Sequence, residues 1–145
     1  MRFKKIAALA ACLLATAGAA SASPVAGRWR TLENEGVVDV YDCDGGVCGR
    51  VVTSRRILAD PGLKDAYNKD RSLRSRPIKG LAIFQDMRGG PTVWKGRVYN
   101  PGDGGTYSGT LTLVDANTLK LRGCIVFPLC KTQVWTRMHE GAAGR

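Results

Sequence analysis

The chain has 145 residues, a formal net charge of +10 and a charged fraction of 23%. This length suits one ordinary domain with its own hydrophobic core and leaves no room for a large multidomain enzyme. The positive charge favours an acidic partner. Nucleic acid is not the expected partner, because no aromatic ladder, zinc-ligand spacing or RNA-binding signature accompanies the basic residues.

The first 22 residues have the organisation of a secretory signal peptide. A basic start is followed by an apolar run over residues 6–17 and by the small-residue cleavage signal Ala20-Ser21-Ala22. The apolar run is too short, and the chain after it too polar, for a transmembrane segment. The sequence therefore predicts a soluble periplasmic domain over residues 23–139, followed by a disordered tail over residues 140–145.

A lipoprotein is the alternative to soluble export. Leu9-Ala10-Ala11-Cys12 resembles a lipoprotein cleavage box, which would place a lipid on Cys12. Soluble export is preferred, because the apolar stretch before Cys12 is shorter than the ~7 to 15 residues typical of a signal peptide.

Four cysteines remain after cleavage, and an oxidising compartment makes disulfides their expected state. They are Cys43, Cys48, Cys124 and Cys130. Four cysteines allow three connectivities, and the sequence alone selects none of them. Turn residues inside each close pair favour Cys43 with Cys48 and Cys124 with Cys130. The spacing disfavours a zinc site with four cysteine ligands, and the sequence has no redox Cys-x-x-Cys motif.

From Gly27 onward, short runs with strand chemistry alternate with turn signals, which is typical of an antiparallel sandwich or barrel. The central reversal is Asn-Pro-Gly-Asp-Gly-Gly at residues 100–105, where Pro cannot donate to a ladder and Gly allows a positive φ. The sequence predicts an all-β fold, an antiparallel up-and-down barrel of about eight strands. The expected strands are residues 27–32, 37–42, 47–53, 81–87, 92–99, 106–114, 118–123 and 131–138.

Side-chain alternation gives the expected strands one apolar and one polar face. Tyr107, Gly109, Leu111 and Leu113 share one face, and the intervening Ser and Thr residues share the other. Such a pattern is typical of a barrel wall, and a barrel of about eight strands is either filled by side chains or holds one small ligand.

Residues 54–80, called the basic loop below, interrupt the strand pattern. Between Arg55 and Lys79 they carry eight basic residues against three acidic ones. Asp60-Pro61 has the form of a helix N-cap and first helical residue, so a short helix is expected over residues 61–67. The basic loop is either a patch that docks on an acidic envelope surface or protein partner, or a solvated connection.

Segments along nearly the whole predicted mature chain carry a resemblance to a known family, from the opening Gly27-Arg28-Trp29 to the closing Trp135-Thr136-Arg137. The family is DUF2147, small exported bacterial proteins with no assigned function. The matching segments are residues 27–31, 40–43, 45–52, 73–81, 96–104, 106–107, 119–123 and 132–137.

The resemblance implies a lipocalin-like barrel. In such barrels a Trp of the first strand closes the floor under an Arg of the last strand, which gives Trp29, Arg137 and the nearby Trp135 structural roles. A cation over an aromatic face contributes about 1 to 2 kcal/mol when desolvated. The chain departs from the family pattern at Asn100, where Asp is usual, and at Gly105, where Lys is usual, so an ion-binding role of that turn is not carried over.

No catalytic, metal-binding or cofactor-binding residue is predicted. The only histidine, His139, lies beside the expected tail, and no Gly-x-Ser-x-Gly elbow exists for a serine hydrolase. A carboxylate-dependent hydrolase stays open as a further alternative, because two carboxylates in one cleft would suffice. The candidates are Asp39, Asp42, Asp86 and Asp103, and the sequence singles out no pair among them.

Binding is therefore the preferred function: a non-catalytic module for a small amphipathic or anionic ligand. A barrel mouth is a usual ligand site, and arginine can grip a carboxylate or phosphate with two hydrogen bonds. The predicted ligand contacts are Arg97, Tyr99, Tyr107, Arg50 and Arg122. The first alternative is an envelope scaffold that acts through the basic loop.

Overall fold

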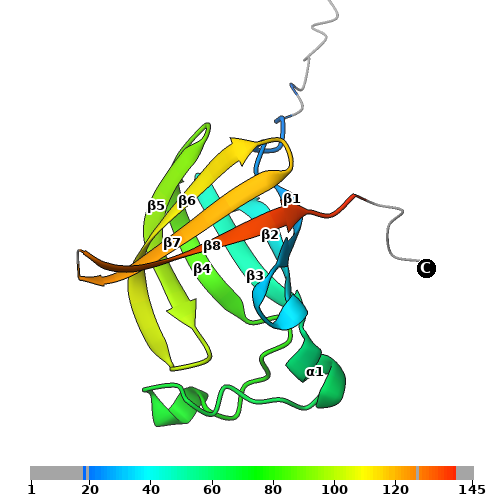
Figure 1. Cartoon of the computed structure of the whole chain (residues 1–145), viewed down its shortest axis with the longest axis vertical. Helices are drawn as coiled ribbons and strands as arrows, with labels where there is room; N and C mark the ends of the chain where they lie inside the picture. Colours follow the sequence, from blue (N-terminus) through cyan, green and yellow to red (C-terminus); the bar gives the residue numbers. More distant parts are fainter. Residues whose placement is uncertain (1–17, 19, 127, 140–145) are drawn as a thin grey trace, which may run out of the picture.

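The computed structural model describes residues 18, 20–126 and 128–139, and in it eight antiparallel strands follow one another around a closed barrel (Figure 1). The first strand pairs with the second and also with the last, which closes the circle. The predicted eight-stranded antiparallel barrel is confirmed. The strands are β1 (Gly27–Thr31), β2 (Val37–Cys43), β3 (Gly46–Thr53), β4 (Ala82–Gly89), β5 (Val93–Asn100), β6 (Gly105–Asp115), β7 (Thr118–Val126) and β8 (Leu129–Arg137).

The predicted signal peptide lies almost entirely outside the described residues, as do Cys12 and the predicted tail over residues 140–145.

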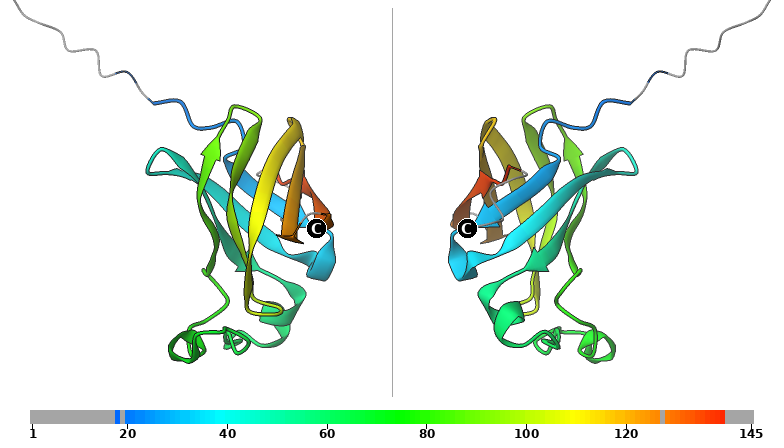
Figure 2. Two further views of the ribbon diagram at one scale, coloured as in Figure 1. Left: turned by 90° about the vertical axis from the view of Figure 1, so that its left-hand side faces the viewer. Right: turned by 90° about the vertical axis from the view of Figure 1, so that its right-hand side faces the viewer.

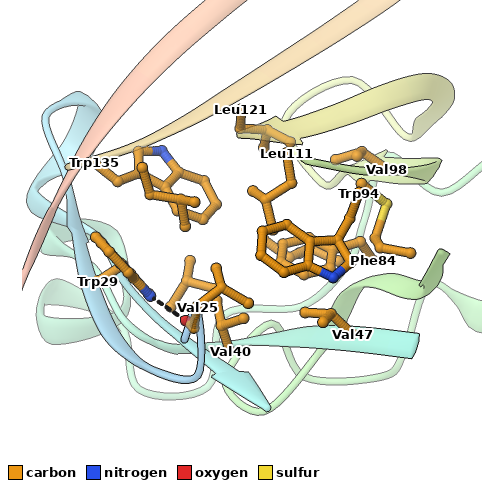
Figure 3. Close-up of a cluster of buried hydrophobic side chains, with 14 residues drawn as sticks. Val25, Trp29, Val40, Val47, Phe84, Trp94, Val98, Leu111, Leu121 and Trp135 are labelled. Carbon is orange, nitrogen blue, oxygen red and sulfur yellow. Dashed lines mark hydrogen bonds between the residues drawn. The ribbon is translucent and has the colours of Figure 1, made fainter. Parts of the chain in front are cut away.

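The core consists of large inward side chains from all eight strands (Figure 3). Strand alternation explains most of these positions, while the neighbours Ile83 and Phe84 are both buried in β4, whose pairing has register irregularities. Those exposed by 2% or less include Trp29, Phe84, Met87, Leu111, Leu119 and Trp135.

One end of the barrel is closed by Trp29 and Arg137. The guanidinium carbon of Arg137 lies 4.2 Å from the centroid of the Trp29 ring, as the lipocalin resemblance implies. The indole Nε1 of Trp29 donates a 2.9 Å hydrogen bond to the carbonyl of Val25, which is fully buried. The segment before β1 therefore forms part of the barrel floor.

Two disulfides tie neighbouring strands, and they are the local pairings that the turn residues favoured. Cys43 bonds Cys48 where β2 turns into β3. Cys124 bonds Cys130 at directly opposed positions of β7 and β8.

The basic loop folds differently from the expectation. Its helix is α1 (Arg55–Ala59), which begins before the predicted start at Pro61, because the Ser54 hydroxyl accepts from the Ile57 N–H at 3.2 Å and caps that start. The helix predicted over residues 61–67 is wrong. Asp60 instead ends α1, and its carboxylate accepts from the Gly62 N–H in a tight turn.

Two single-turn 3-10 helices complete the fold, η1 (Glu33–Glu35) and η2 (Arg71–Leu73). Within the described ranges, no helix has the length and apolar character needed to cross a membrane.

The basic loop lies across the end of the barrel opposite the floor (Figures 1 and 2). Ile57, Ile78 and Leu81 form a small second core there, against which Tyr99 of β5 packs. The loop is thus anchored to the outside of the wall beside the barrel mouth.

Candidate functional site

A cavity of about 730 Å³ opens at the end of the barrel opposite the floor. Its apolar wall comes from inward positions of successive strands, and Trp135 lies where the cavity meets the packed core. Its mouth is framed by η1, by the basic loop and by the β5–β6 and β7–β8 hairpins. The wall residues are Val38, Val51, Ile83, Val98 and Leu121.

Gly123 of β7 helps to keep this space open. It follows Leu119 and Leu121 on the inward face, but a Cβ added to it would meet no atom within 4 Å. A larger inward residue at this position would project into the cavity, so the glycine sets part of the cavity's width.

The β5–β6 turn places a hydrogen-bonded carboxylate at the mouth. Asp103 accepts from the Tyr107 hydroxyl at 2.7 Å, from the Gly105 N–H at 2.7 Å and from the Asn100 amide at 3.0 Å. Burial raises the pKa of Asp103, but these hydrogen bonds outweigh burial and hold the pKa below its usual 3.8. Asp103 is therefore ionised at neutral pH.

Tyr107 points into the barrel, because it pairs across the strands with the inward Val98. Its bond to Asp103 raises the pKa of the phenol above 10.0, so the hydroxyl stays protonated. The site thus presents a neutral phenol and a carboxylate side by side at the edge of an apolar wall.

A second carboxylate, Asp65 of the basic loop, is fully buried beside the mouth. It accepts from the Tyr99 hydroxyl at 2.5 Å, from the Asn68 amide at 2.8 Å and from Arg76 Nε at 2.9 Å. Burial raises the pKa of Asp65, but these hydrogen bonds and the charge of Arg76 bring the pKa below 3.8. This network fixes the loop to β5 through Tyr99.

The loop also contacts the β5–β6 turn through backbone. Gly104 has a φ of +71°, and a Cβ at this position would lie 1.8 Å from the carbonyl oxygen of Tyr67. Only glycine allows both this conformation and this approach. The basic loop and the turn that carries Asp103 are therefore seated directly on one another.

The opposite side of the mouth is built from η1 and β8. Glu33 pairs with Lys131 at 2.9 Å and accepts from the Gln133 amide at 3.2 Å. Gln133 in turn accepts from the indole Nε1 of Trp135 at 3.0 Å. A chain of polar contacts thus connects the rim to the indole at the bottom of the cavity.

The structure brings together only two of the five predicted ligand contacts. Tyr99 and Tyr107 line the cavity, whereas Arg50, Arg97 and Arg122 lie on outward strand faces and are not among its lining residues. Arg50 pairs with Asp39 at 2.8 Å and stacks on Tyr41 at 5.0 Å. Arg97 donates to the Thr106 carbonyl at 3.3 Å. Ligand contact by any of the five stays a prediction.

The four candidate catalytic carboxylates are dispersed. Asp39 pairs with Arg50, Asp42 accepts from the backbone of Ser23, and Asp86 pairs with Arg88. Only Asp103 lines the cavity, where the second lining carboxylate is Glu33.

His139 is exposed, and across the described ranges no group of three or more His, Cys, Asp or Glu side chains could hold a metal ion.

Sequence reasoning missed the residues that shape the mouth. Asp65, Asn68 and Arg76 lie in an irregular loop, where no periodicity indicates their direction. Gly123 could have been found, because alternation with Leu121 places it on the inward face.

The family model "Uncharacterized protein conserved in bacteria (DUF2147)" matches residues 27–137. A solved structure described as protein HP1028 from Helicobacter pylori, of the lipocalin family, superposes with a TM-score of 0.72. That likeness covers 80% of this chain and 84% of the other at 22% identity, so it concerns the fold. The search of curated proteins found no match. With its lipocalin-like barrel and a family match across every strand, the chain belongs to the DUF2147 family.

Proposed function

We propose that this protein is an exported, periplasmic and non-catalytic binding protein for a small amphipathic ligand with an anionic end. The cavity of about 730 Å³ above Trp135 carries the proposal. Ligand pockets usually span about 300 to 1,000 Å³ and combine apolar walls with a few placed polar groups. The apolar part of the ligand would lie along the walls near Leu121.

The charges at the mouth favour an anionic end. Arg56 and Lys64 line the opening with exposed side chains, and among the described residues neither takes part in an ion pair. Of the carboxylates that also line the cavity, Glu33 is paired with Lys131, whereas Asp103 is hydrogen-bonded to the neutral Tyr107 and keeps its negative charge. Arg56 and Lys64 together outweigh Asp103, so the lining has an excess of positive charge. The remaining positive charge would attract a carboxylate or phosphate.

Export is supported by the signal-peptide pattern and by the two disulfides, which persist in oxidising compartments. Native mass spectrometry of protein purified from its own periplasm is the direct test for a retained ligand.

Titration with dansylated undecanoic acid tests the cavity. Gly123→Trp fills the open space, and we expect it to weaken binding of this probe at least about tenfold, which corresponds to ~1.4 kcal/mol. Lys120→Trp, on the outward face of the same strand, is the matched control and should bind as the native protein does. Equal binding by both variants would refute the cavity as the site.

A second candidate is docking on an acidic envelope surface, favoured by the exposed basic side chains of the loop. Several of its arginines have structural partners, because Arg76 binds Asp65 and Arg55 binds Glu35. The exposed residues left for docking include Arg56, Lys64, Lys69, Arg71 and Lys79. Docking through them should weaken steeply as salt rises, whereas binding inside the cavity should depend on salt much less.

A further inference from the structure

The folded domain begins abruptly at Ser23. Its backbone N–H donates a 2.9 Å hydrogen bond to Asp42 Oδ2 at the end of β2. The next residue, Pro24, accepts from Arg137 at 2.6 Å, and Val25 is fully buried under Trp29. Ala22, immediately before Ser23, is exposed. Among the described residues, the hydrogen bond between Ser23 and Asp42 is thus the first one along the chain.

Ser23 is also the residue that follows the small-residue signal Ala20-Ser21-Ala22. We propose that signal-peptide removal after Ala22 creates an α-ammonium at Ser23 that pairs with Asp42 and fastens the N-terminal segment over the barrel floor. This inference rests on the export that forms part of the proposed function. The ligand cavity lies at the other end of the barrel and is independent of it.

The chemistry of the step is hydrolysis of one peptide bond. The bond between the Ala22 carbonyl carbon and the Ser23 nitrogen breaks. Water adds its hydroxyl to the Ala22 carbonyl carbon, which becomes a carboxylate, and adds its hydrogen to the Ser23 nitrogen, which becomes an amine. At neutral pH that amine takes up a proton, since the usual α-amino pKa is about 7.7 to 8.0. A neutral amide donor facing Asp42 is thereby replaced by a cation.

The Asp42 carboxylate already has the charge and the position to pair with an ammonium at Ser23. The Ser23 hydroxyl and backbone N–H both donate to its carboxylate and hold the pKa of Asp42 below 3.8, so it is ionised at neutral pH. Hydrogen bonds with a charged donor and a charged acceptor are roughly twice as strong as neutral ones. Cleavage should therefore strengthen a contact that already exists.

The surrounding charges are mixed. Asp44 lines the same small surface pocket as Ser23 and Asp42, and it adds negative charge. Arg88 of β4 donates to the Asp44 carbonyl and pairs with Asp86, while Arg137 of β8 donates to the Pro24 carbonyl. The two arginines oppose a further cation, but within the described part of the chain the hydrogen bond of the Ser23 nitrogen goes to Asp42.

The first test is the identity and the pKa of the new terminus. Mass analysis of the processed protein should give a chain that starts at Ser23. Its α-amino pKa, followed by NMR, should lie above the usual limit of about 8.0 and should return to the usual range in Asp42→Asn. Asp44→Asn is the matched control and should leave most of the increase in place.

The second test compares the processed chain with one that retains Ser21 and Ala22 before Ser23. A raised α-amino pKa stabilises the folded state below the unfolded pKa, and that stability is lost as pH rises through the folded pKa. The processed chain should therefore unfold at higher urea than the extended chain at pH ~7, and this difference should vanish by pH ~10 or in Asp42→Asn.

The possible failures are distinguishable. A processed chain that starts at Ser23 but has an ordinary α-amino pKa would leave export intact and refute the ion pair. A chain that starts at a lipid-modified Cys12 would refute both the ion pair and soluble export, without bearing on the cavity.

Discussion

Arg137 covers the ring of Trp29 and also donates hydrogen bonds to backbone carbonyls of two other segments. Besides the 4.2 Å stacking contact, its guanidinium donates to the carbonyls of Pro24 and Ala26 and to that of Ala116. One side chain thus joins the segment before β1, the β6–β7 turn and the end of β8.

Replacing Arg137 by Met should remove the cation and all of these hydrogen bonds while keeping an apolar stem over Trp29. We expect the free energy of unfolding to fall by ~2 to 3 kcal/mol. Urea denaturation followed by Trp fluorescence measures the change. Arg137→Lys, which keeps the charge but loses the planar fork, should recover less than half of the loss. Full recovery by Lys would mean that charge alone matters.

Gly104 should be the most sensitive glycine at the barrel mouth. Ala at this position would place Cβ against the Tyr67 carbonyl at a positive φ, so the basic loop must move away from the β5–β6 turn. We expect faster proteolysis within residues 60–78 and a loss of about 2 kcal/mol or more. Gly123→Ala meets open space and is the control, which should leave both measurements unchanged.

Acid should release the basic loop. The pKa of Asp65 is depressed in the folded state, so its contribution to stability is present above the unfolded pKa of about 3.9 and is lost as pH falls through the lower folded value. Urea midpoints measured from neutral pH down to pH ~2 should therefore decline less steeply in Asp65→Asn. An identical acid profile for the two proteins would contradict this assignment.

The Tyr99 hydroxyl should contribute measurably to the free energy of unfolding through the same network around Asp65. Tyr99→Phe removes the donor to Asp65 and the acceptor for Asn68 without changing the ring that Arg76 covers. A loss of about 1 to 2 kcal/mol is expected because Asp65 stays buried with one donor fewer. Tyr41→Phe, at a half-buried ring on another part of the wall, is the control and should cost much less.

Loss of the Cys124–Cys130 disulfide should loosen the β7–β8 hairpin. Replacing Cys124 and Cys130 together by Ser removes a short covalent loop, which the loop-entropy estimate values at ~2 kcal/mol. Ile125 and Leu129 beyond the disulfide are already exposed, by 74% and 64%, so little core is lost with it. Hydrogen exchange should therefore rise in this hairpin and stay unchanged in β2 and β3.

Strand periodicity predicted the barrel, its order and its inward faces. Tyr107 was assigned to the face of Leu111, and the structure has it facing the cavity. The same rule places Arg97 outside, since it neighbours the inward Val98, and the structure has it exposed there.

The position of Tyr99 at the mouth and the start of α1 both depend on how the basic loop folds. Tyr99 also lies on an outward position, yet the basic loop folds over it and brings it to the mouth. That contact joins Asp65 to a strand far along the chain, and no local pattern encodes it. The helix begins after Ser54, whose side chain caps its N-terminus, and not after Asp60. The Asp60 carboxylate instead accepts from the Gly62 N–H in a turn.

The pairing of β1 with β8 determines when the barrel can close during folding. It aligns three residue pairs, from Trp29 with Arg137 to Thr31 with Trp135, and the cross-link from Arg137 to Ala26 spans 111 positions. Until the C-terminal strand arrives, the edges of β1 and β7 are unpaired and open to association with other chains. A nascent molecule therefore completes the barrel last, and during that interval its open strand edges favour aggregation with other unfolded chains.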